Sequence, residues 1–261
     1  MHIVSPSVDL IPGIVVPGEL IEKIYQGYRR CYSDKTDVEF LETPTEAEME
    51  KFIRRMRKTP HLSPLEHVSL TFHISNVSRA MTHQLVRHRL ASYSQQSQRY
   101  VQMDDLPVVM PSFSYVKDEE TKKTLQEIVL NTAAYTENAY ADLIAFDVKP
   151  EDARCVLPNF VATQIVVTMN LRSLLHFFEE RMCYRAQEEI RIVADMMFNI
   201  CKDILPCVFE DAGPKCMMYG RCPEHRPCGN KPYKGGSKHG IETRNDSENE
   251  EGTDSAVGQA A

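Results

Sequence analysis

Residues 67–103 contain no Asp, Glu or Lys, although acidic residues are common elsewhere in the chain. The stretch opens with VSLTFHI (68–74), which alternates and is rich in β-branched and aromatic residues, and this predicts a strand. Ser78 can then cap a helix that runs to Arg87. The stretch also carries Arg79, Arg87, Arg89, Arg99, His67, His73, His83 and His88. Any fold of this chain must supply counter-charges for these guanidinium groups from outside the stretch.

A ligand phosphate is the simplest such counter-charge, because a guanidinium group binds phosphate oxygens through two parallel hydrogen bonds. Neutral donors accompany the arginines at Ser92, Ser94, Ser97 and at Gln95, Gln96 and Gln98. Two alternatives stay open: a solvated basic face, or arginines paired with carboxylates from other segments. The 30 basic and 37 acidic residues give a net charge of −7, which disfavours sequence-blind binding of nucleic acid.

The composition along the 261 residues predicts three regions: a folded core domain over 1–210, a Cys-rich appendix over 211–230 and a disordered polar tail over 231–261. No apolar window is long enough for a membrane span, and the first ten residues do not resemble a secretory signal. We therefore expect a cytoplasmic protein with reduced cysteines and no membrane partner.

The remaining pattern predicts mainly helices. We expect Thr43, Pro44 and Glu46 to form a capping box with proline at the first helical position. We also expect Leu125, Ile128, Val129, Ala133, Tyr140, Leu143 and Ile144 to form the buried face of a long helix. Helices are expected over 19–32, 43–56, 118–147, 149–156, 170–181 and 185–204, a turn over 61–67, a strand over 160–169 and an extended piece over 108–115, with 88–103 unassigned.

The string RHRLASYSQQSQRY (87–100) resembles the signature of the flavin-dependent thymidylate synthases: R-H-R, seven residues, then Ser97. HLSPLEHVSLTFHI before it, and EDARCVLP (151–158), TMNLRSLLHFFEER (168–181) and AQEEIR (186–191) after it, are similar to further family blocks, so the resemblance covers about residues 20–209. It implies an α/β (α+β) fold with helices around a small, mostly antiparallel sheet, and a homotetramer whose active sites combine several subunits.

The same resemblance implies the reaction, the reductive methylation of dUMP to dTMP. Methylenetetrahydrofolate is the carbon donor, NADPH-reduced FAD the hydride carrier, and dUMP, folate and NADPH are the small-molecule partners. It implies FAD contacts at His61, Ser63, Arg87, His88, Arg89, Gln95, Asn170, Arg172 and His176. It implies dUMP contacts at Gln84, Arg87, Gln95, Gln96, Ser97, Gln98, Arg99, Arg154 and Arg181, with Ser97 and Arg99 on the phosphate.

Arg181 is the residue to which the resemblance assigns the chemistry. Placed against the uracil, its guanidinium would favour loss of the N3 proton and make C5 nucleophilic, so no Cys nucleophile is needed. Structural alternatives remain: Arg181 could complement a helix dipole, Ser97 could close a turn, Arg154 could form a salt bridge, and Gln84 could be a surface residue.

The chain departs from the family at Ser94 and Gln95, where Asn and Glu are usual, at Glu188, where Trp is usual, and at Arg185, where some members carry His. These departures keep a second hypothesis open, a catalytically silent nucleotide-binding relative whose Cys-rich appendix is an interaction module.

Cysteines outside the family blocks suggest a metal. Cys216, Cys222, Cys228 and His225 could hold a structural zinc ion, although the C-x5-C-x5-C spacing lacks a C-x2-C pair. Free thiols or a disulfide are the alternatives. Cys31, Cys155, Cys183 and Cys201 are expected to be small buried apolar residues.

Overall fold

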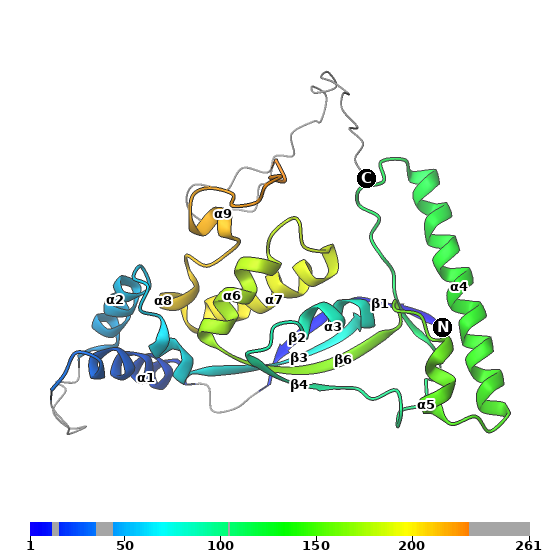
Figure 1. Ribbon diagram of the computed structural model, residues 1–261, viewed down its shortest axis with the longest axis horizontal. Helices are drawn as coiled ribbons and strands as arrows, with labels where there is room; N and C mark the ends of the chain where they lie inside the picture. Colours follow the sequence, from blue (N-terminus) through cyan, green and yellow to red (C-terminus); the bar gives the residue numbers. More distant parts are fainter. Residues whose placement is uncertain (12–15, 35–43, 104, 230–261) are drawn as a thin grey trace, which may run out of the picture.

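The computed structural model shows a four-stranded antiparallel sheet with helices α3, α6 and α7 on one side (Figure 1). It describes residues 1–11, 16–34, 44–103 and 105–229, so the tail over 231–261 lies outside these ranges. The strands are β1 (His2–Val4), β2 (Ser7–Leu10), β3 (Ser69–Ser78), β4 (Ala91–Gln95), β5 (Pro107–Val109) and β6 (Ala162–Asn170). The helices are α1 (Pro17–Arg30), α2 (Glu46–Met56), α3 (Arg79–Leu85), α4 (Glu119–Ala145), α5 (Pro150–Ala153), α6 (Leu171–Arg181), α7 (Glu188–Ile204), α8 (Pro206–Phe209) and α9 (Lys215–Met218), with 3-10 turns η2 (Ser63–His67) and η3 (Arg154–Val156). The expected fold class is confirmed.

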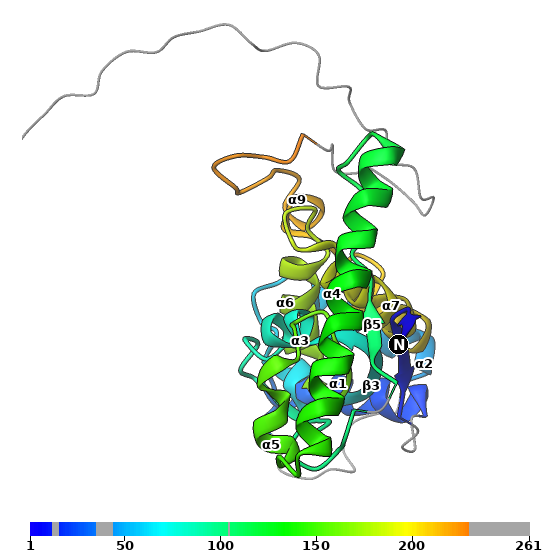
Figure 2. The same ribbon diagram turned by 90° about the vertical axis from the view of Figure 1, so that its right-hand side faces the viewer.

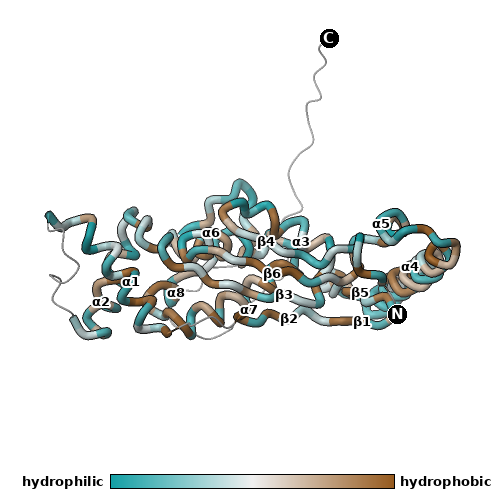
Figure 3. Tube along the Cα trace, turned by 90° about the horizontal axis from the view of Figure 1, so that it is seen from below, coloured by the Kyte–Doolittle hydropathy of each residue, from teal (hydrophilic) through white to brown (hydrophobic). Residues whose placement is uncertain are grey.

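The main sheet has the strand order β2-β3-β6-β4, and β1 pairs separately with β5 in a parallel arrangement. Side chains alternate along β3: Phe72 and Ile74 are buried, whereas Thr71 and His73 are half-buried on the other face. That face is polar, with Thr71 Oγ1 bonded to its counterpart on Thr168 at 2.9 Å. Hydrophobic stretches accordingly run through the middle of the molecule along β3 and β6 (Figure 3).

A bulge interrupts the register between β3 and β6 after Ile74. Asn76 within it has φ of 57°, in the left-handed region that Asn tolerates better than most residues. The extra twist of a bulge interrupts regular pairing locally, and α3 begins at Arg79, three residues after Asn76. The bulge therefore sets where the Arg- and His-rich segment begins.

The core lies between the sheet and the helices, and its largest side chains are aromatic. Phe178 makes edge-to-face contacts with Phe177, Phe198 and Phe209 at centroid distances of 5.8, 5.5 and 5.8 Å. Such geometry is favoured by the ring quadrupoles. A second, smaller cluster under α4 and α5 consists of Met103, Leu106, Tyr140, Ala153 and Val161.

Helix α4 stands beside one end of the sheet, and its upper part rises away from the other elements (Figures 1 and 2). Of its residues, Ala133, Thr136 and Tyr140 are buried. The expectation that Ile128 belongs to the buried face is wrong, because its side chain is 57% exposed. The reason is that only the second half of α4 packs on the small cluster.

Among the helices of the described ranges, none combines the length and the apolar character that a membrane span needs.

The expected cap of the second helix is wrong by two residues. Thr45, not Thr43, is the N-cap: its hydroxyl accepts from the Glu48 amide at 3.4 Å, and the Glu48 carboxylate accepts from the Thr45 amide at 2.9 Å. Pro44 therefore precedes the cap, which suits a residue without an N–H and with restricted φ. Thr43 itself lies outside the described residues.

Other expected boundaries shift slightly: α7 begins at Glu188, β6 begins at Ala162, and the unassigned segment contains β4.

The expectation that four cysteines are buried is right for Cys201 and wrong for three others. Cys31 and Cys155 are exposed and Cys183 is half-buried. Each of these three lies at a helix end or in a turn, where the side chain projects past the packed face.

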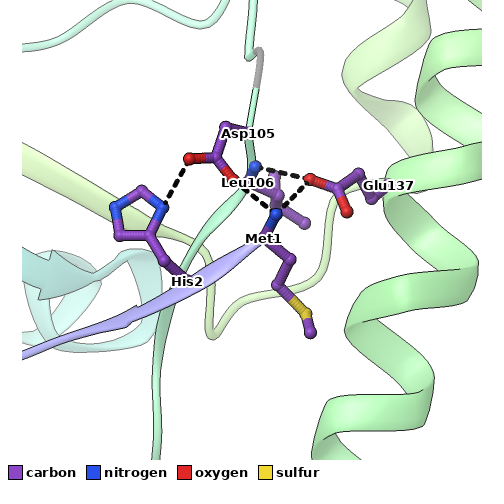
Figure 4. A network of polar contacts seen from close by, with 5 residues as sticks. All are labelled: Met1, His2, Asp105, Leu106 and Glu137. Carbon is purple, nitrogen blue, oxygen red and sulfur yellow. Dashed lines mark hydrogen bonds and ion pairs between the residues drawn. The ribbon is translucent and has the colours of Figure 1, made fainter.

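Charged contacts tie β1 to the segment before β5 and to α4 (Figure 4). The Met1 amine contacts the carboxylates of Asp105 and Glu137, the latter at 2.8 Å. His2 Nδ1 lies 3.0 Å from Asp105 Oδ2, and the Leu106 amide donates to Glu137 at 2.9 Å. These contacts hold residues 105 and 106, which follow the Gln- and Ser-rich segment 92–98 in the sequence.

Candidate active site

A pocket of about 310 Å³ opens between α3 and the chain that connects α5 to β6. Gln98 and Arg154, both expected to contact the nucleotide, line it. The full lining is Arg79, His83, Gln98, Glu151, Arg154, Cys155, Leu157, Pro158 and Asn159. Two guanidinium groups against one carboxylate give the pocket a net positive charge.

The two arginines of this pocket repel one another. Burial and, second, the charge of Arg154 lower the pKa of Arg79 below its ordinary value. Arg79 Nη1 has one weak contact, 3.4 Å from the backbone oxygen of Gln96. An anion in the pocket would relieve this repulsion, so the electrostatics favour a phosphate or carboxylate ligand.

Glu151 holds the two arginines that were expected near the nucleotide. Its carboxylate binds Arg99 through Nε and Nη2, both at 2.9 Å, and its backbone oxygen accepts from Arg154 Nε at 3.0 Å. Arg99 is thus paired with a carboxylate in this structure, which is one of the alternatives that the sequence left open. The Arg99 and Glu151 side chains are 52% and 36% exposed, so a ligand phosphate can compete for this pair.

The pocket side chains are held by well-defined local structure. Ser78 is the N-cap of α3, as expected, and its hydroxyl accepts from the Met81 amide at 3.0 Å. The Glu189 carboxylate accepts from the Ser78 amide and hydroxyl, both at 2.6 Å. On the opposite wall, buried Ala153 anchors α5 in the small cluster, which positions Arg154.

The polar segment after β4 does not point uniformly into this pocket. Gln95 Nε2 donates to the hydroxyls of Thr82 and Thr163 at 2.9 and 3.5 Å. Gln96 lines a second pocket, of about 340 Å³. Ser97 Oγ accepts from the Arg99 amide at 3.2 Å, so Ser97 closes a turn here. The roles of these residues toward a nucleotide stay predictions.

Arg181, His88 and His176 form a second polar cluster, at the far end of α3. Arg181 Nε donates to His88 Nε2 at 2.9 Å, and the rings of His88 and His176 lie 6.0 Å apart. Since α3 has seven residues, roughly 10 Å separates its two ends. Arg181 therefore does not line the pocket that holds Arg154 within one chain.

His88 is neutral at physiological pH. Burial, followed by the charges of Arg181 and His176, lowers the pKa of His88 from 6.5 to about 4. Because Nε2 accepts from Arg181, we assign the proton to Nδ1. The rings of His88 and Phe177 pack edge to face, with their centroids 5.0 Å apart. The imidazole thereby holds the Arg181 guanidinium in one direction.

Two segments with expected flavin contacts lie side by side. The Leu171 amide donates to the Val68 oxygen at 3.0 Å, which brings the start of α6 against the end of η2. Arg172 also forms an ion pair with Glu66 of η2. Asn170 caps α6 as expected, with Oδ1 accepting from the Ser173 amide at 2.8 Å.

His61 and Ser63 precede this contact. His61 Nδ1 lies 3.0 Å from the hydroxyl of Tyr32, and its ring packs edge-on against Tyr28 at 5.5 Å. Ser63 begins η2, whose Pro64 and Leu65 are buried. The turn is therefore rigid, which suits a ligand contact.

Arg87 and Arg89 flank His88 and are exposed. The Arg87 amide donates to the Gln84 backbone oxygen at 3.3 Å, but neither guanidinium group makes a hydrogen bond or ion pair with another residue in the described ranges. Gln84, by contrast, is bonded to the Gln187 side chain and, at 3.4 Å, to the Ala80 oxygen. The roles of Arg87 and Arg89 toward a flavin stay predictions, and Gln84 would have to release Gln187 before it could contact a nucleotide.

Four residues of these sites were missed by reasoning from the sequence: Glu66, Glu151, Glu189 and, as a pocket residue, Arg79. The three carboxylates bind residues that are 52 to 111 positions away in the sequence, and no local pattern marks such pairs. Arg79 was noted in the acid-free stretch, and its spacing on α3 from Ser78 could have placed it at the helix start.

The Cys-rich appendix packs next to the end of α6, where Lys215 forms an ion pair with Glu180. Burial and, after it, the thiols of Cys222, Cys183 and Cys228 raise the pKa of Cys216. His225 is exposed. Within residues 1–11, 16–34, 44–103 and 105–229, no three His, Cys, Asp or Glu side chains are arranged to hold a metal ion. The expected zinc ligands stay a prediction.

Comparisons with known proteins agree with this fold. A sequence profile described as "Thymidylate synthase complementing protein" matches residues 19–207. The flavin-dependent thymidylate synthase of Nitratidesulfovibrio vulgaris is 41% identical over 245 residues, which cover 88% of this chain and 97% of the relative. That of Geobacter sulfurreducens is 45% identical over 198 residues, covering 75% and 83%.

A solved structure is also similar, the UMP/dUMP methylase PolB from Streptomyces cacaoi bound with 5-Br dUMP. Its TM-score is 0.67 at 20% identity, over 80% of this chain and 96% of that chain. The fold is that of an α+β protein, and it carries two separate clusters of arginines. The profile match and the relatives show the family: this chain belongs to the thymidylate synthase complementing proteins, the flavin-dependent thymidylate synthases.

Proposed function

We propose that this protein is a methyltransferase that converts dUMP to dTMP, with methylenetetrahydrofolate as carbon donor and NADPH as reductant. The observation that carries the proposal is the family match over residues 19–207, which includes every expected contact for dUMP and FAD. When bound, reduced FAD supplies the hydride. The protein supplies binding, orientation and electrostatic stabilisation.

The pocket beside α3 would hold the nucleotide phosphate. Arg79 and Arg154 already face it, and Arg99 would turn to the phosphate when Glu151 releases it. A phosphate dianion can accept charge-assisted hydrogen bonds from several guanidinium groups at once. The flavin phosphates would be bound by the unpaired Arg87 and Arg89.

Arg181 would polarise the uracil ring. Its Nε is held by neutral His88, so the two Nη groups are left to donate to a pyrimidine oxygen and to stabilise negative charge there. Neutral His88 suits this task better than a charged one, since an imidazolium would repel the guanidinium. Loss of the N3 proton would then make C5 the nucleophile.

Arg154 and Arg181 lie near opposite ends of α3 within one chain, which supports a site shared between subunits. We therefore propose the homotetramer that the family resemblance implies. The proposal also includes a cytoplasmic location and a structural zinc ion on the Cys-rich appendix, which takes no part in the reaction.

Release of tritium from 5-tritiated dUMP tests the function. Purified protein reconstituted with FAD should release tritium and form dTMP only when NADPH and methylenetetrahydrofolate are both present. Protein that binds dUMP and flavin yet forms no dTMP under these conditions would overturn the proposal and favour a catalytically silent relative.

A further inference from the structure

The appendix after α8 folds back onto the end of α6. Lys215 forms an ion pair with Glu180, and the Tyr219 hydroxyl donates to Glu179 at 3.3 Å. Helix α9 and the segment after it accordingly lie over α6 (Figures 1 and 2). This fold-back brings cysteines of the appendix toward the turn that follows α6.

Contacts to the appendix lie on both sides of Cys183 in that turn. On one side, the pair between Lys215 and Glu180 places Cys216 beside the end of α6. On the other side, Arg185 Nη1 donates to the Arg226 backbone oxygen, and Arg185 Nε lies 3.9 Å from Glu224. Cys228 follows two residues after Arg226, so the appendix approaches the turn of Cys183 near both Cys216 and Cys228.

The electrostatic contacts describe the same neighbourhood. The Cys216 thiol interacts with those of Cys222, Cys183 and Cys228, and the Tyr184 hydroxyl interacts with Cys228. All four thiols are free, and none is fully buried. The chain's other cysteines include Cys201 and Cys207, which are buried in the core and cannot join them.

We propose that Cys183, Cys216, Cys222 and Cys228 together bind one Zn²⁺ ion, so that the fourth ligand is Cys183 of the turn between α6 and α7 and not His225. Four thiolates at about 2.3 Å form the tetrahedral site that Zn²⁺ prefers in structural roles. Binding releases the thiol protons to solvent and leaves a net negative charge. Arg185, Arg221 and Arg226, in the same two segments, offset that charge.

In the described residues these four side chains do not surround one position, so binding a single ion requires the appendix to move. Gly220 and Gly229 border the segment with φ of 67° and 80°, and most side chains between them are exposed. The site would fasten the appendix to the residue two positions after Arg181. It does not depend on the proposed reaction, so either idea can fail alone.

Metal analysis and cobalt substitution test this site in the full chain, purified with a reductant. We expect about one zinc per chain. The Co²⁺ form should show tetrahedral ligand-field bands with an intense sulfur-to-cobalt charge-transfer band. Cys183→Ser should weaken metal binding at least tenfold in competition with a chelator and reduce that band. Cys31→Ser, which removes an exposed cysteine elsewhere, and His225→Ala should change neither.

A measurement on the unaltered chain covers the case in which Cys183→Ser fails to fold. Chelation should speed tryptic cleavage after Arg221, and added Zn²⁺ should slow it again. Metal-free protein with intact thiols, a disulfide among these four cysteines in reduced preparations, or loss of the metal in His225→Ala would each overturn the proposal.

Discussion

Replacing Glu151 with Gln should tighten the binding of dUMP. The Glu151 carboxylate now occupies Arg99 through two bonds of 2.9 Å, and a nucleotide phosphate must displace it. Glutamine keeps the size of the side chain, and the backbone oxygen that holds Arg154 is untouched. The substitution therefore frees one cation without dismantling the pocket.

The magnitude follows from the exposure of the pair. An ion pair between side chains that are 52% and 36% exposed contributes about 0.2–1 kcal/mol. Removing this competitor should lower the Kd for dUMP by up to about fivefold. Arg99→Ala removes the guanidinium itself, and loss of a charge-assisted hydrogen bond costs about 1.5–3 kcal/mol, or roughly 10- to 150-fold in Kd.

Titration calorimetry of the flavin-loaded protein with dUMP measures both changes. The double variant decides whether Glu151 acts through Arg99: in the Arg99→Ala background, Glu151→Gln should have little effect. Weakening of dUMP binding by tenfold or more in the single Glu151→Gln variant would refute the reasoning, because Glu151 would then be a substrate contact.

Three further predictions concern the ends of α3. NMR titration of the His88 ring should give a pKa near 4. Since this lies below the ordinary 6.5, the contribution of neutral His88 to stability is complete above pH 6.5 and is lost as the pH falls toward 4; an ordinary value would contradict the burial argument. Arg181→Ala should retain flavin but lose most dTMP formation, and it should raise the pKa of His88; unchanged turnover would exclude a role in the chemistry. Ser78→Ala should lower the free energy of unfolding by about 1–3 kcal/mol, because the cap is lost and Glu189 Oε2 loses its hydroxyl donor while Oε1 keeps the backbone amide; a denaturant midpoint equal to that of the parent would contradict this.

Local features of the fold were predictable from the sequence. Helix caps were predicted from side-chain chemistry at Ser78 and Asn170. Strands were predicted from residue type and alternation around 68–74 and 160–169. Both signals depend only on residues that are close in the sequence. The box at Thr45 was misplaced because Thr43 and Thr45 both precede an acidic residue at the required spacing, and only the backbone distinguishes them.

Long-range partners could not be predicted in the same way. Glu151 and Arg99 are 52 residues apart, and Glu189 and Ser78 are 111 apart, so nothing near either residue indicates the other. The exposure of Ile128 depends on how far α4 extends past the small cluster, which is a tertiary property. Cys183 was expected to be buried as part of a core element, but α6 ends at Arg181, before this residue.

The central claim is that the arginine pocket beside α3 binds the phosphate of a pyrimidine nucleotide. Calorimetry with dUMP and with deoxyuridine, which lacks the phosphate, tests it most directly. The account predicts that deoxyuridine binds at least about 100-fold more weakly than dUMP, and that Arg154→Ala removes most of this difference. Equal affinities for the two ligands, or a phosphate preference unchanged in Arg154→Ala, would contradict it.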